Sequence, residues 1–407
     1  MPDPKQNWES GLGVGSWKLG VDHTALIVGA GIGGLAAGIA LRRAGWRVRI
    51  FERADAPRTV GFGLGLAPNA MAALRQLGVA GTVSPQTVTP TAGEVRHPDG
   101  RVIRRLVGRV DTVAAADLVS LIMRPALHSA LIGALDPDVI EVNSEAADFA
   151  IDARRVRLRL TNGTTAIGDL LVGADGFHSV IRAQLHPAEP PARPSGYFAL
   201  RGESYALDRL NGLHAIWYLG RGVEAGCVQA SANAIHWFVS LFADDVRSGP
   251  VNEESVLRRV TSRLDAQFQA IAGATPPESM RLDELFERDP LATWGDGPVT
   301  LLGDEAHPML PHTGQGAAQA LEDADGLGRA MKGAADPIAA LRQYEAVRAR
   351  RTRAVVRSGP RIARVTTTRN PIVAALRNGA IRMVPAAVLA TALSRVGADP
   401  NRELGAG

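Results

Sequence analysis

The sequence predicts an α/β protein in which a second, antiparallel sheet is inserted into a lobe built on a parallel sheet. Three observations lead to this fold class. Residues 23–52 alternate between apolar β-rich and helical patterns, as a βαβ unit does. Residues 299–302 form another short apolar run ahead of a helical pattern. Residues 195–245 instead show the alternation and the aromatics typical of antiparallel strands.

The N-terminal unit has clear boundaries. The apolar run "HTALIVGA" at 23–30 ends in alanine after a glycine and predicts a buried parallel strand. The apolar spacing of 33–44 predicts a helix, which Gly45 ends, and "RVRIFE" at 47–52 predicts the next strand. These three pieces form one βαβ unit.

Further elements follow along the chain. We expect helices and strands at 68–78 (helix), 93–107 (two strands around a turn), 124–135 (helix), 155–176 (a hairpin around Asn162-Gly163, then an apolar strand), 253–272 (helix) and 338–368 (helix). The stretch 381–396 is mildly amphipathic, which fits packing on the domain or contact with a membrane surface.

Composition excludes several classes of protein. The net charge is only +4 and no dense basic run carries interleaved aromatics, so we expect no nucleic-acid binding. Cys227 is the only cysteine, which excludes internal disulfides and cysteine-based zinc or iron–sulfur centres, and we expect no metal site. No apolar run reaches the roughly 18–20 residues of a membrane span. The first residues lack the apolar core of a signal peptide, so a cytoplasmic protein without stable membrane insertion is expected.

A glycine-rich turn joins the first strand to the first helix. Gly29 permits the tight turn, Gly31 lets backbone N–H groups approach a pyrophosphate, and Gly34 allows close packing of helix and strand. The helix N-terminus favours phosphate. Glu52 ends the second strand, where a carboxylate binds an adenosine ribose. This context indicates FAD or NAD rather than NADP; the alternative is a plain glycine-rich turn with Glu52 on the surface.

A second glycine-bearing segment, "LLGDEAHPMLPHTGQGAAQALEDA" at 301–324, is unnecessary for an NAD dehydrogenase. Asp304 follows an apolar strand and is placed to accept hydrogen bonds from ribityl hydroxyls. Gly314, Gln315 and Gly316 offer backbone N–H groups at a helix start, which suit the N1–C2=O edge of an isoalloxazine ring. The two segments together favour FAD.

At this point the sequence resembles the class A flavoprotein monooxygenases, the para-hydroxybenzoate hydroxylase-like aromatic hydroxylases. Three motifs carry the resemblance: "GAGIGGLAAGIAL" with "RIFER", "LLVGADGFHSVIR" at 170–182, and the 301–324 segment. The resemblance implies further cofactor-binding residues, namely Gly33, Arg53, Arg124, Asp175 and Pro311. It departs from the family at Glu305, where alanine is common, and least resembles it in the middle sheet.

The resemblance also implies the reaction. NAD(P)H, bound transiently, would reduce FAD; O₂ would then give a flavin C4a-hydroperoxide that hydroxylates or epoxidises a small aromatic, heteroaromatic or polycyclic substrate. The rival hypotheses are an FAD-dependent reductase or dehydrogenase on the same fold that transfers no oxygen, and a flavin-binding sensor. We expect a monomer or homodimer.

The resemblance divides the chain into a Rossmann-like FAD-binding domain, an inserted substrate domain and C-terminal helices. The expected segments are an arm at 1–21, FAD-binding parts at 22–192 (with a β-excursion at about 93–112) and 290–370, the substrate sheet at 193–289, and a tail at 371–407.

Three residues are candidates around the substrate. Arg201 is placed to hold an anionic or enolised substrate, or else it forms a surface pair. Tyr218 either hydrogen-bonds the substrate or is a core residue. His312 precedes the Gly-Gln-Gly turn and is either a base for a phenolic proton or a packing residue.

Overall fold

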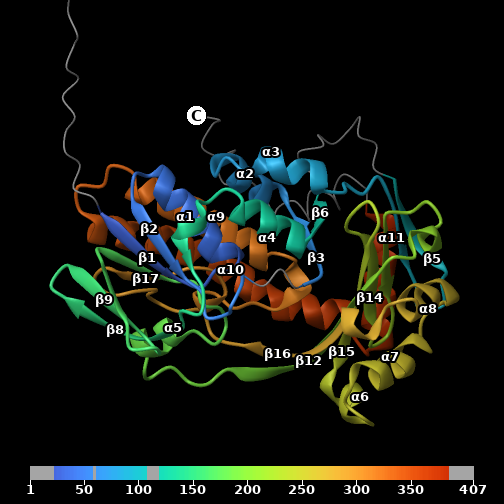
Figure 1. The fold of residues 1–407 in the computed structure, drawn as a ribbon. Helices are drawn as coiled ribbons and strands as arrows, with labels where there is room; N and C mark the ends of the chain where they lie inside the picture. Colours follow the sequence, from blue (N-terminus) through green and yellow to red (C-terminus); the bar gives the residue numbers. More distant parts are fainter. Residues whose placement is uncertain (1–22, 58–60, 108–118, 385–407) are drawn as a thin grey trace, which may run out of the picture.

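The computed structural model describes residues 23–57, 61–107 and 119–384. The expected N-terminal arm and most of the expected tail lie outside these ranges. Figure 1 shows two lobes, one with a parallel sheet packed against helices and one with a larger sheet, and the long helix α10 (Pro337–Thr366) runs between them.

The first lobe is built on a parallel sheet with the strand order β17-β11-β1-β2-β7. Its strands are β1 (Thr24–Val28), β2 (Arg47–Phe51), β7 (Ile140–Glu141), β11 (Leu170–Gly173) and β17 (Val299–Leu301). The three strands β1, β11 and β17 are short and almost completely buried, as expected for a parallel sheet covered on both faces, whereas β2 and β7 toward the edge are partly exposed. Helix α1 (Ile32–Arg43) joins β1 to β2, which confirms the predicted βαβ unit.

Helices and short strands complete this lobe. They are β3 (Gly63–Leu66), α2 (Pro68–Gln76), α3 (Ala80–Val83), β6 (Ser120–Met123), α4 (Arg124–Ile132), β8 (Ala146–Asp152), β9 (Arg155–Leu160), β10 (Thr165–Gly168), α5 (Val180–Leu185) and α9 (Gly316–Met331). Strands β9 and β10 form the predicted hairpin, with Gly163 at φ 84°. Helix α9 packs on α1 so closely that a Cβ on Gly328 would lie 2.8 Å from the Cβ of Ala40.

The second lobe holds a seven-stranded sheet in the order β16-β12-β15-β14-β13-β4-β5. Its strands are β4 (Ala92–Arg96), β5 (Val102–Val107), β12 (Arg193–Ser204), β13 (Ala215–Leu219), β14 (Glu224–Gln229), β15 (Ile235–Phe242) and β16 (Met280–Glu287). All neighbours are antiparallel except β13 and β4. The predicted antiparallel sheet is therefore present.

Two strands of this sheet come from an unexpected part of the chain. We expected a β-excursion of the FAD-binding domain at about 93–112; its strands β4 and β5 extend the second sheet, in which β4 pairs with β13. The N–H of His214 donates to the carbonyl of Ala92 at 2.8 Å at the start of this pairing. Alternation of polar and apolar residues predicts a strand but does not identify its partner strand. The second sheet combines two separate segments of the chain and is not built from 193–289 alone.

Helices cover one face of the second sheet. They are α6 (Ala243–Arg247), α7 (Glu253–Thr261) and α8 (Ala266–Gly273). The single helix predicted at 253–272 is thus wrong, because Asp265 interrupts it and caps α8 by accepting a hydrogen bond from the N–H of Phe268 at 2.8 Å. A capping carboxylate of this kind starts a new helix.

The C-terminal part is helical, as predicted. Helix α10 contains Pro360 and is followed by α11 (Pro371–Met383), which packs beside β5. Within the described ranges, no helix combines the length and the hydropathy that crossing a membrane requires.

Candidate active site

The predicted cofactor residues gather at one edge of the parallel sheet. Strands β1, β2, β11 and β17 run in the same direction, so their carboxyl ends meet there. Gly29, Glu52, Asp175 and Asp304 each follow one of these ends within a few residues. This edge is where open α/β sheets bind ligands.

The glycines of the first turn have two different roles. Two of them allow close backbone packing, and one leaves open space beside the backbone. A Cβ on Gly34 would lie 1.9 Å from the carbonyl oxygen of Gly29, and a Cβ on Gly29 would lie 2.2 Å from that of Ala174. A Cβ on Gly31 would meet nothing within 4 Å, and Gly31 is the N-cap of α1. Open space in front of the free N–H groups of a helix start is what a pyrophosphate needs.

Glu52 is tied to this turn by its own carboxylate. Oε2 accepts a hydrogen bond from the N–H of Ala30 and Oε1 accepts one from the N–H of Ala54, both at 2.9 Å. These bonds fix the carboxylate beside the turn and leave lone pairs for ribose hydroxyls. Arg53 lies next to it and is exposed.

Asp304 and Arg124 are exposed side chains that lie within electrostatic reach of each other. Asp304 is exposed although residues 301–303 and 305–308 around it are buried. Arg124, at the start of α4, is also exposed, yet the surrounding protein desolvates its guanidinium and lowers its pKa, and Asp304 is the nearby carboxylate that opposes this shift. A side chain that solvent reaches but protein surrounds is typical of the wall of a cleft, so we infer a cleft beside Asp304 and Arg124.

The second glycine turn presents backbone at the start of α9. Gly314 has φ 63°, and a Cβ there would meet nothing within 4 Å. Pro311 begins the short helical turn η7 (Pro311–Thr313) and is exposed. The first residues of α9 from Gly316 have no carbonyl four positions earlier in the helix, so their N–H groups are available.

The side chain of Gln315 is turned away from the exposed part of this turn, and its backbone N–H donates to Thr313 Oγ1 at 3.3 Å. Its side chain is buried, and Oε1 accepts hydrogen bonds from Asn69 Nδ2 at 2.9 Å and from Gln319 Nε2 at 3.2 Å. The amide therefore points into the protein, away from the cleft that Asp304 faces.

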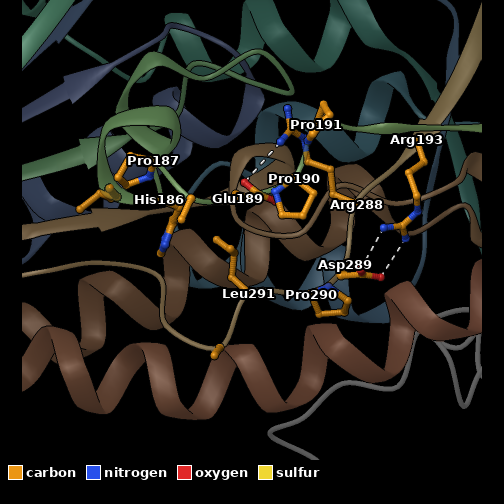
Figure 2. Close-up of a pocket in the computed structure, with 13 residues that line it drawn as sticks. His186, Pro187, Glu189, Pro190, Pro191, Arg193, Arg288, Asp289, Pro290 and Leu291 are labelled. Carbon is orange, nitrogen blue, oxygen red and sulfur yellow. Dashed lines mark hydrogen bonds and ion pairs between the residues drawn. The ribbon is translucent and has the colours of Figure 1, made fainter.

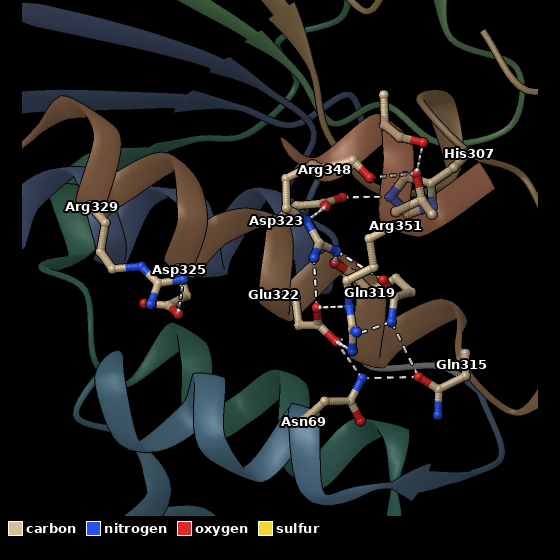
Figure 3. A network of polar contacts seen from close by, with 12 residues as sticks. Asn69, His307, Gln315, Gln319, Glu322, Asp323, Asp325, Arg329, Arg348 and Arg351 are labelled. Carbon is tan, nitrogen blue, oxygen red and sulfur yellow. Dashed lines mark hydrogen bonds and ion pairs between the residues drawn. The ribbon is translucent and has the colours of Figure 1, made fainter. Parts of the chain in front are cut away.

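A buried polar network supports the whole segment, as Figure 3 shows. Asp323 accepts hydrogen bonds from Gly303 N–H at 3.0 Å and His307 Nε2 at 2.5 Å, and Arg348 Nε donates to its other oxygen at 2.6 Å. Burial by itself raises the pKa of Asp323, but His307 and Arg348 outweigh burial and hold this pKa at about 2. A second carboxylate, Glu322, binds Arg348 as well.

Asp175 lies close to Glu305, the residue that follows Asp304. Its Oδ2 accepts a hydrogen bond from the N–H of Val180 at 2.7 Å, whereas Oδ1 is buried without a partner among the described atoms. Burial raises the pKa of Asp175. The neighbouring Glu305 accepts from the N–H of Gly176 at 3.1 Å, so it connects the second and third motifs.

One row of the second sheet faces away from α7 and α8. The cross-strand pairs place Arg201, Phe238, Gly226 and Trp217 side by side across β12, β15, β14 and β13. The Arg201 guanidinium lies 5.6 Å from the ring centroid of Phe62, beside β3. This row therefore forms an aromatic surface with one cationic end.

Arg201 keeps part of its donor capacity. It forms an ion pair with Asp283, its side chain is 34% exposed, and its Nε is buried without a partner among the described residues. On the same face of the sheet, next to this row, His236 stacks between Phe62 and Phe238. Burial, reinforced by the charge of Arg201, lowers the pKa of His236 to about 4, so this imidazole is neutral at pH 7.

The expectation that Tyr218 contacts a substrate is corrected. Tyr218 has no exposed surface, packs on Phe268 of α8 and donates its hydroxyl to Asp265 at 3.0 Å. Side chains alternate along a strand, so Trp217 faces the row and Tyr218 faces the core. Tyr218 is a core residue, the alternative that the sequence left open.

His312 points toward the second sheet. Its Nε2 lies 3.1 Å from Ser240 Oγ, its ring packs edge-on against Tyr197, and its side chain is only 1% exposed. Burial lowers its pKa to about 4. A direct role as base would need access that this conformation does not give.

Several residues of this region were missed from the sequence. Asn69, Asp323 and Arg348 hold the second glycine turn, and His128 Nε2 lies 2.7 Å from the carbonyl oxygen of Ala30 in the first turn. The acidic pair Glu322-Asp323 inside an otherwise apolar helical pattern was the available signal. Arg348, which pairs with these two carboxylates, lies on another helix, and the sequence around it gave no such signal.

The described residues fit FAD. The space at Gly31 and Gly314, the fixed carboxylate of Glu52 and the exposed carboxylate of Asp304 follow one another along the same sheet edge.

A hollow of about 430 Å³ lies elsewhere, between residues 185–193 and 288–292 (Figure 2). None of its lining residues is a predicted site residue, and its walls include several prolines and the Arg193–Asp289 pair.

Comparison with known proteins agrees with FAD as the cofactor. The family described as "FAD binding domain" matches residues 22–359. The chain is 34% identical to the aurachin C monooxygenase/isomerase of Stigmatella aurantiaca over 362 residues, covering 89% of this chain and 94% of that protein. It is 30% identical to the 6-hydroxynicotinate 3-monooxygenase of Bordetella bronchiseptica, covering 85% and 92%.

A solved structure has the same fold. The HpxO protein of Klebsiella pneumoniae, complexed with FAD and uric acid, superposes with a TM-score of 0.84 at 24% identity, covering 92% of this chain and 96% of that one.

Proposed function

Because this chain belongs to the FAD-binding-domain family of flavoprotein monooxygenases, we propose that it uses NAD(P)H and O₂ to hydroxylate or epoxidise an aromatic or heteroaromatic substrate. The observation that carries this proposal is the position of the Arg201 row: an aromatic surface with a cationic end lies in the lobe next to the flavin cleft. Bound FAD supplies the hydride acceptor and the oxygen activation.

The chain's own residues hold the cofactor in this proposal. Gly31 and the start of α1 bind the pyrophosphate, and Glu52 binds the adenosine ribose. Asp304 accepts hydrogen bonds from the ribityl hydroxyls. The N–H groups at the start of α9 stabilise negative charge that gathers at the adjoining edge of the ring.

The second lobe binds the substrate. Phe62, Phe238 and Trp217 contact a flat ring and exclude water from it. Arg201 donates to an acidic or enolic oxygen, and this keeps the ring electron-rich. Arg124 adds a second positive charge within electrostatic reach of Arg201, which favours an anionic form of the substrate. The names of the two relatives, which act on a heteroaromatic acid and on aurachin C, support this substrate class.

The test is a screen with hydroxylated aromatic and heteroaromatic acids under isotopically labelled O₂. We expect some of them to accelerate NAD(P)H oxidation and to gain one labelled oxygen atom. NAD(P)H oxidation without label in any product would instead support the reductase hypothesis. A protein that binds FAD but never oxidises NAD(P)H would support the sensor.

A further inference from the structure

A buried acid–base pair joins the two lobes and is unused in the proposed function. Glu224 lies on β14 of the second sheet, and His312 lies on η7, in the turn expected to bind the flavin. Glu224 Oε2 and His312 Nε2 are 3.7 Å apart, and the two side chains are 2% and 1% exposed.

Polar contacts surround the pair. Thr366 Oγ1 donates to Glu224 Oε2 at 2.6 Å, and the indole N–H of Trp217 is a further hydrogen-bond donor to this carboxyl. Ser240, the cross-strand neighbour of Glu224, places its Oγ 3.1 Å from His312 Nε2. The carboxyl group of Glu224 is therefore surrounded by residues of strands β13, β14 and β15, helix α10 and the turn η7.

The charges near Glu224 do not neutralise a carboxylate directly. Arg377 of α11 is within electrostatic reach, but its guanidinium donates to the carbonyls of Gly220 and Thr366. On the β12 side, the Tyr197 hydroxyl accepts from Thr367. Burial raises the pKa of Glu224 to about 7 and lowers that of His312 to about 4. Between about pH 4 and about pH 7 the pair therefore holds one proton, on Glu224.

We propose that Glu224 is a positioning residue: as a neutral acid it holds His312, and with it the Pro311–Gly314 turn, against the substrate sheet, and its deprotonation weakens this contact. At 3.7 Å the carboxyl packs against His312 Nε2 without a direct hydrogen bond, and Ser240 Oγ is the atom within hydrogen-bond distance of this nitrogen. A neutral carboxyl accepts from Thr366 and places no unpaired charge against the imidazole. A buried carboxylate without a cationic donor is costly, and moving the turn away from the sheet relieves that cost. This inference rests on the proposed function, because the turn matters only if it binds flavin.

The inference predicts a link between pH and FAD affinity. The pKa of Glu224 is raised in the folded protein, so its stabilising contribution is full at low pH and is lost as the pH rises through about 7. If binding FAD requires the neutral acid, the Kd for FAD rises by up to about tenfold per pH unit above that value, the limit for one linked proton.

The experiment is a fluorescence titration of the flavin-free protein with FAD from about pH 5.5 to about pH 8.5. We expect the wild-type Kd to rise above neutral pH and the Glu224→Gln Kd to stay flat, because the amide has the size of the acid and no charge. Glu94→Gln is the control: Glu94 is a buried glutamate of the same sheet, paired with Arg96. It should keep the wild-type profile.

A second variant covers the case in which Glu224→Gln does not fold. Thr366→Val removes a hydrogen bond that lowers the pKa of Glu224, so the rise in Kd should move to higher pH. A wild-type Kd that is independent of pH, a pH-dependent Glu224→Gln, or an unshifted Thr366→Val would each overturn the inference. FAD binding at pH 6 with no oxygen transfer would overturn only the proposed function.

Discussion

The carboxylate of Asp323, buried in α9, accepts a hydrogen bond at 3.0 Å from the backbone N–H of Gly303. Helix α9 thereby holds the turn that directs the next side chain, Asp304, into the open cleft. One aspartate is wholly buried and the other is exposed. The two residues should therefore respond to mutation in opposite ways.

Replacing Asp304 by alanine should weaken FAD binding by about 10- to 100-fold, the value of one or two hydrogen bonds to a charged group. The melting temperature of the flavin-free protein should hardly change, because the side chain is exposed. Flavin fluorescence and thermal unfolding measure the two effects. Asp289→Ala, at another exposed aspartate, is the control, and full FAD occupancy of the Asp304 variant would refute its ribityl role.

Replacing Asp323 by asparagine should destabilise the flavin-free protein by about 3–5 kcal/mol, because Arg348 loses a buried partner. The folded pKa of Asp323 is lowered from 3.8 to about 2, so its contribution is present above pH 3.8 and is lost as the pH falls toward 2. This contribution is about 2 kcal/mol. Urea unfolding at several pH values measures it; equal acid sensitivity of wild type and variant would contradict the prediction.

The first turn offers a pair of matched glycine substitutions. Gly31→Ala adds a Cβ in open space at φ −72°, so the flavin-free protein should fold normally and FAD should bind at least about tenfold more weakly. Gly34→Ala puts a Cβ 1.9 Å from Gly29 O and should prevent folding. Circular dichroism and FAD titration distinguish them. Unaltered FAD affinity of Gly31→Ala would argue against a pyrophosphate there.

Arg201→Gln should raise the KM for the substrate by about 10- to 100-fold, because a charged hydrogen bond is lost. The Kd for FAD should be unchanged. Arg281→Gln is a close control, since Arg281 pairs with the same Asp283 but is largely exposed. An unchanged KM for Arg201→Gln would leave this arginine as a structural partner of Asp283.

Tyr218→Phe should leave kcat and KM unchanged. It removes one buried hydrogen bond to Asp265 and should cost about 1 kcal/mol of stability in chemical unfolding. A large rise in KM at wild-type stability would return Tyr218 to the substrate site.

Local patterns were sufficient for much of the fold. The βαβ unit, the hairpin at Asn162-Gly163 and helix α10 match their predicted ranges closely, because each depends on residues near one another in the chain. The failures are of two kinds. The break between α7 and α8 depends on one capping side chain, Asp265, inside a continuous helical pattern. Whether β4 belongs to the first or the second lobe depends on its partner strand, β13, which lies over a hundred positions away in the chain.

The sequence by itself determined the cofactor and its two glycine-bearing turns, because the free N–H groups of a helix start and the carboxylates that end strands are local features. The tertiary structure alone decided which face of the second sheet each side chain occupies. It placed Trp217 on the sheet face that carries Phe238, Tyr218 in the core, and Glu224 against His312. Burial and pairing between distant segments set these outcomes, and a linear pattern does not contain them.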